Sequence, residues 1–136
     1  MSIINSDKLI IDRSNSVLFS FVSDFDNFGK LMPEQVTDWE STADTCSFTI
    51  SGMASLSMRM ALKQPNDKIV MASVGEKPFS YELICHFVAI SDNSTEVQLV
   101  FDAQLSPMIA MMATRPLQNF INILVNKLKA YAEENL

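Results

Sequence analysis

The side chains that most often carry catalysis or hold metals are scarce here, with one histidine and two cysteines in the whole sequence. Cys46 and Cys85 lie far apart, each inside an apolar run, so we predict two buried free thiols in a reducing compartment. A metal site or disulfide needs closer clustering, so we predict no metal and no cofactor. Catalytic patterns such as HExxH, GxGxxG or a P-loop are missing, and no residue is assigned as catalytic. Carboxylates brought together by folding stay an open alternative.

Positive charge is also scarce. The 10 Lys and Arg against 16 Asp and Glu give a formal net charge of −6. Nucleic-acid binders and proteins that dock on anionic lipids concentrate basic residues on one face, so neither partner is expected. Residues 1–12 lack the features of a signal peptide, and no run reaches the roughly 18 apolar residues of a membrane span. We predict a cytoplasmic protein without stable membrane insertion; a protein partner is left undefined.

Glycine and proline, with three and five residues, fall mostly at boundaries between patterned segments, so no linker or low-complexity tract is expected. The 136 residues have the size of one domain, and 48% hydrophobic residues suffice for a packed core. We therefore predict a single domain over residues 1–136.

The first part of the chain predicts a strand followed by short helices. Residues 2–12 are rich in Ile and Leu, as expected of a strand. Ser14 or Asn15 then offers an N-cap oxygen for a helix whose apolar residues recur at helical spacing up to Phe28. Residues 24–27 interrupt this helix or begin a second one, and Gly29 and Pro33 mark its end.

The rest of the chain predicts an antiparallel sheet and a long helix. Between Gln35 and Gln104 apolar and polar residues alternate in six runs separated by turn residues, which is typical of strands with one buried face. Ser106 and Pro107 then suit the start of a helix with an apolar stripe over residues 117–131. Pro116 interrupts its hydrogen bonding and predicts a kink or a division into two helices.

This order of elements resembles the helix-grip fold of the START-like superfamily, also called SRPBCC, which includes birch-pollen-allergen-like proteins and polyketide cyclases. The segments that carry the resemblance are SVLFSFVSD at residues 16–24, KLMP at residues 30–33 and the closing helix from Pro107. The resemblance implies an α+β fold in which a seven-stranded curved antiparallel sheet wraps the long C-terminal helix, with two short helices after the first strand. It also implies a cavity between sheet and helix that binds lipids, sterols, polyketides or hormones.

The apolar faces of the strands and the last helix predict which side chains line that cavity. Several are methionines, whose flexible side chains suit an adaptable apolar binding surface as well as ordinary core packing. The predicted lining residues are Leu56, Met58, Met60, Met71, Leu83, Cys85, Phe87, Leu99, Phe101, Met108, Met112 and Phe120.

The polar candidates lie on the opposite side of the same alternation. His86 should face away from Cys85 and Phe87, and Arg59, Glu82 and Asp102 should lie on solvated faces.

Three functions follow from this pattern. A carrier or sensor of a hydrophobic small molecule, such as a lipid or polyketide, fits best, because the predicted inner surface carries no charge. A cyclase- or hydrolase-type enzyme would need polar groups that converge in the cavity. A protein-interaction module resembling chaperone regulators would instead need exposed apolar patches.

Overall fold

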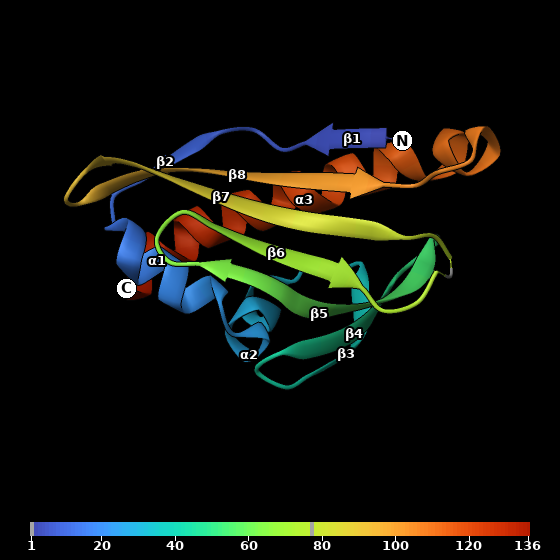
Figure 1. Ribbon diagram of the computed structural model, residues 1–136, viewed down its shortest axis with the longest axis horizontal. Coiled ribbons are helices and arrows are strands. Elements are labelled where there is room, and N and C mark those ends of the chain that lie inside the picture. The colour runs from blue at the N-terminus through green and yellow to red at the C-terminus, as the bar shows by residue number, and fades with distance from the viewer. Residues whose placement is uncertain (1, 77) are drawn as a thin grey trace.

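The computed structural model describes residues 2–76 and 78–136 of the chain (Figure 1). The strands are β1 (Ser2–Asn5), β2 (Leu9–Ile11), β3 (Val36–Ser41), β4 (Thr45–Ile50), β5 (Ala54–Gln64), β6 (Lys68–Ser73), β7 (Tyr81–Ser91) and β8 (Ser94–Ala103). The helices are α1 (Asn15–Val22), α2 (Phe25–Phe28), the 3₁₀ turn η1 (Gly29–Leu31) and α3 (Pro107–Asn135). The predicted α+β class is confirmed, as are the six strands between the short helices and the long one.

The strands form one antiparallel sheet in the order β1-β8-β7-β6-β5-β4-β3, with β2 also paired to β8. β3 to β8 follow one another as a meander, because each strand pairs with the next one along the chain. The α3 helix runs along the sheet on one side, behind β7 and β8 in Figure 1, and packs against β8, β1 and β2. This arrangement is the helix-grip fold that the sequence predicts.

The predicted first strand is wrong in one respect, because it is two strands rather than one. Ser6 separates β1 from β2, and its side chain takes the place of a ladder partner. The Leu99 amide donates to Ser6 Oγ at 2.9 Å, and the Ser6 amide donates to the Leu99 carbonyl at 2.8 Å. A buried polar group needs such partners, so Ser6 lets the chain break its strand without leaving a donor unpaired.

Side-chain caps fix the short helices where the sequence indicates them. Ser14 Oγ accepts a hydrogen bond from the Val17 amide at 3.3 Å, which caps α1. Asp24 Oδ1 accepts from the Asp26 amide at 2.8 Å, so residues 24–27 begin a second helix. The apolar sides of both helices are buried in the same core as the sheet.

α3 continues through Pro116 as one helix, so the predicted division does not occur. Its buried stripe consists of Ala113, Leu117, Phe120, Ile121, Leu124, Val125, Leu128 and Ala132. In the part of the chain that the structure describes, no helix is long and apolar enough to span a membrane.

Candidate site between sheet and helix

The face of the sheet that looks toward α3, here called the inner face, carries most of the predicted lining residues. Nine of them are at most 2% exposed: Leu56, Met58, Met71, Leu83, Cys85, Phe87, Leu99, Phe101 and Phe120. Met60 is half-buried and packs against them. Cross-strand pairing brings them together, because Met71 lies opposite Leu83, Leu83 opposite Phe101, and Cys85 opposite Leu99.

The positions of Met108 and Met112 contradict the prediction that they line the cavity. Their side chains are 74% and 73% exposed, and Met111 beside them is 88% exposed. The helical period explains the error: one turn before Leu117 lies the buried Ala113, and one turn before that the half-buried Ile109. Continuing the buried stripe backward from Leu117 in steps of four residues would have selected Ala113 and Ile109 and left Met108 and Met112 on the outside of the helix.

Aromatic rings that the predicted set omits join the sheet to α3. Phe48 stacks on Trp39 with ring centroids 5.4 Å apart, and on Phe120 of α3 with centroids 5.8 Å apart. A second group surrounds Phe101, which stacks on Tyr81 at 4.8 Å and meets Phe79 edge-on at 6.4 Å. The alternation within β4 places Phe48 on the inner face, so the sequence contained the signal for this residue.

The titratable groups of the inner face are held neutral. Burial raises the pKa of the Cys46 thiol to about 12, and burial also raises the pKa of Cys85. The pKa of Tyr81 is raised as well, first by burial and then by the nearby Cys46, and its hydroxyl donates to the Ser57 carbonyl at 3.0 Å. These groups therefore offer a ligand no charge at neutral pH.

The charged candidates lie on the other side of the sheet, which we call the outer face. His86 is half-buried there between its cross-strand partners Lys68 and Gln98. Arg59 and Glu82 are exposed, and Asp102 is half-buried opposite Glu82. The predicted outward orientation of these side chains is confirmed. Within residues 2–76 and 78–136, no group of three or more His, Cys, Asp or Glu side chains is placed to hold a metal ion.

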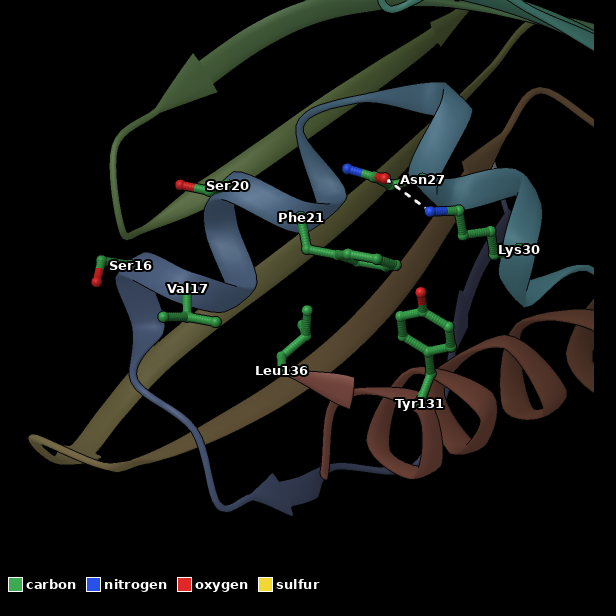
Figure 2. A pocket seen from close by; sticks show the side chains of 8 residues that line it. All are labelled: Ser16, Val17, Ser20, Phe21, Asn27, Lys30, Tyr131 and Leu136. Atoms are coloured by element: carbon green, nitrogen blue, oxygen red, sulfur yellow. Dashed lines mark hydrogen bonds between the residues drawn. The ribbon is translucent and has the colours of Figure 1, made fainter. Parts of the chain in front are cut away.

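A hollow of about 520 Å³ opens at a place that the sequence analysis did not select (Figure 2). It lies between α1, α2, η1 and the end of α3, and its floor contains Phe21 and Tyr131 with ring centroids 5.1 Å apart. At its rim, Lys30 Nζ donates to Asn27 Oδ1 at 3.4 Å. Four separate segments contribute to it, so no local sequence pattern marks it.

Comparison with known proteins supports the fold. No protein-family model matches the sequence, and no curated protein matches it. The structure resembles that of a START superfamily protein from Mycobacterium smegmatis, with a TM-score of 0.76 and 14% identity over 98% of this chain and 99% of that chain. It also resembles norcoclaurine synthase from Thalictrum flavum in complex with dopamine and hydroxybenzaldehyde, with a TM-score of 0.76 and 12% identity over 99% of this chain and 88% of that chain.

Proposed function

Because the chain has the helix-grip fold of the START-like superfamily, we propose that it binds a hydrophobic small molecule between the inner face of the sheet and α3. The observation that carries this proposal is the chemistry of the inner layer. Among the described residues, Ser6 and Thr95 are the polar or charged ones in the buried class, and both are hydrogen-bonded within the protein. A ligand without charge, such as a lipid or polyketide, suits such a surface.

The ligand gains its space by displacing flexible side chains. The inner residues pack as one continuous apolar cluster in the structure. Met58, Met60 and Met71 belong to this layer, and methionine has three rotatable bonds and fills irregular gaps. Rotation of these side chains creates space beside the strands. It costs less free energy than moving branched side chains would.

The first turns of α3 form the gate in this proposal. Met108, Met111 and Met112 are exposed there, and Pro116 follows within the same helix. Pro116 has no amide hydrogen, so the Met112 carbonyl lacks its usual helical partner. This missing bond weakens the connection between the first turns of α3 and the buried stripe behind them.

Binding is favoured over catalysis by the placement of the charged side chains. A cyclase- or hydrolase-type activity needs acids and bases that converge on the ligand. Arg59, Glu82 and His86 all lie on the outer face, with the sheet between them and the inner layer.

A pair of matched variants tests the location of binding. Delipidated protein is titrated with a fluorescent alkyl-chain probe, which we expect to bind with a stoichiometry of one. Met60→Glu introduces a charge at the half-buried edge of the inner face and should weaken binding at least tenfold. Val17→Glu places the same charge in the hollow of Figure 2 and should leave binding unchanged.

Thermal melts of both variants establish that they are folded. Loss of binding in Val17→Glu with full binding in Met60→Glu would move the site to the hollow of Figure 2 and refute the proposal.

A further inference from the structure

The outer face of the sheet carries an apolar row that crosses four adjacent strands. Val100 of β8 pairs with Ile84 of β7, Ile84 with Val70 of β6, and Val70 with Leu62 of β5. Val70, Ile84 and Val100 point away from α3, because their neighbours along each strand are buried on the inner face. Leu62 joins them because a register shift after Met60 pairs it with Val70. Leu62 is 45% exposed, Ile84 and Val100 are half-buried, and Val70 is the most shielded. A solvated sheet face is normally polar, so a continuous apolar row on it points to a partner.

The rows on either side of this apolar row differ in charge. On one side Glu82 lies directly opposite Asp102, and two like charges at such positions repel each other. Arg59 is farther along the same row, beyond Ala72. The ion pairs found among the described residues, Lys63–Asp44 and Lys129–Glu133, involve neither carboxylate of this pair.

The opposite flank is basic at its centre. Lys68 lies directly opposite His86, which is in turn opposite Gln98. Lys8 joins them, since it lines a shallow hollow together with His86 and Gln98, and Glu96 lies at the far side of that hollow. The apolar row therefore separates an acidic pair from a group that contains two lysines.

We propose that this outer face is the interface of a homodimer, in which two copies of the chain pack back to back about a two-fold axis parallel to the apolar row. Such an axis lays the apolar row of one copy on that of the other. It also exchanges the flanks, so that Glu82 and Asp102 of each copy lie over His86 and Gln98 of the other, with Lys68 and Lys8 of that copy on either side. A two-fold interface has to be complementary to itself, and this pattern of one apolar row between opposite charges meets that condition.

The geometry is compatible with ordinary sheet packing. Sheets that pack face to face are aligned and lie about 10 Å apart, which long Lys and Glu side chains span.

The dimer is independent of the proposed ligand site. The gate and the inner face lie on the α3 side of the sheet, so both copies keep access to ligand (Figure 1). A chain that binds no ligand would therefore not count against the dimer, and a monomeric chain would not count against ligand binding.

Charge reversal with rescue tests the interface. Sedimentation equilibrium of the wild-type chain at low salt should show a concentration-dependent dimer. Lys68→Glu and Glu82→Lys should each raise the dimer dissociation constant at least tenfold. The two-fold axis repeats the contact between positions 68 and 82 twice, so each variant brings two like charges together in both. An equimolar mixture of the two variants should dimerise again, since the mixed pair restores both contacts. Native mass spectrometry with one variant ¹⁵N-labelled identifies the mixed dimer.

Matched controls make the same changes of net charge on other surfaces. Lys30→Glu and Glu34→Lys are exposed positions outside the outer face and should leave the dissociation constant unchanged. A wild-type chain that stays monomeric at all concentrations would overturn the proposal. So would a mixture that forms no mixed dimer, or control variants that dissociate as strongly as Lys68→Glu.

Discussion

Single side chains determine the neutral character of the inner layer. Cys46, Cys85 and Tyr81 are the titratable groups there, and burial raises the pKa of each, so all three stay protonated at neutral pH. Alternation along the strands predicted the side of the sheet for Cys85 and His86. It could not predict the pairing of Tyr81 with Ser57, since that contact joins strands far apart in sequence.

The thiols make stability depend on pH. In the unfolded chain a thiol ionises near pH 8.5, whereas Cys46 keeps its proton in the folded state up to a pKa of about 12. The folded state then binds more protons than the unfolded state, so stability falls as pH rises. We expect a loss of about 2 kcal/mol for each thiol between pH 7 and pH 10.

Urea denaturation at several pH values measures this loss. The variant Cys46→Ala/Cys85→Ala should show a clearly flatter profile, with the remaining slope coming from groups such as Tyr81. A profile as steep as that of the wild-type chain would show that the thiols do not cause the pH dependence.

Phe101 tests how tightly the inner layer is packed without ligand. Its ring is 1% exposed and is stacked on Tyr81. Phe101→Ala should therefore lower the free energy of unfolding by about 3–5 kcal/mol in denaturant melts. Ile90→Ala, at a position that is 56% exposed, serves as the control and should change it by less than about 0.5 kcal/mol. A loss near that of the control would mean that Phe101 lines open space instead of packed core.

At the scale of secondary-structure elements, the packing of η1 against β3 depends on a glycine. Gly29 has an ordinary φ of −59°, so its backbone does not require glycine. A Cβ at this position would meet the Trp39 ring, with Cε2 at 2.7 Å and Nε1 closer still. Gly29→Ala should therefore lower the free energy of unfolding, measured in denaturant melts, by about 1–3 kcal/mol because the methyl group overpacks this contact.

A double-mutant cycle isolates that clash. Trp39→Ala removes the whole ring that the new methyl group would meet. Adding Gly29→Ala to Trp39→Ala should then lower the free energy of unfolding much less than adding it to the wild-type chain. Equal costs in both backgrounds would show that the clash with Trp39 is not the cause.

The α3 helix combines a rigid part and an exposed part. Residues 120–128 contain five buried side chains, whereas the first turns expose three methionines ahead of Pro116. Amide hydrogen exchange should therefore be faster over residues 108–113 than over residues 120–128, and it should slow when an apolar ligand binds. Pro116→Ala supplies the missing amide donor at position 116 and should reduce the difference in exchange rate between these two segments. Equal protection of both parts, unaffected by ligand, would leave Pro116 without a role in gating.

For the whole molecule, the sequence predicts the layers better than it predicts the site. Period-two alternation and the helical stripe identify the inner face, because burial of one side constrains every second residue of a strand. Met108 and Met112 were misplaced because the buried stripe continues backward through Ala113 and Ile109, which leaves the methionines on the outside of α3. The hollow of Figure 2 combines residues from four segments, and only the folded chain brings them together.

The central claim is that an apolar ligand lies between the sheet and α3, and methionine methyl NMR tests it directly. The methyl groups of Met58, Met60 and Met71 mark the inner face, whereas Met111 marks the exposed first turns of α3. A nitroxide-labelled alkyl chain bound inside should broaden the signals of Met58, Met60 and Met71 most strongly. Broadening confined to Met111 and other exposed methionines would contradict the claim.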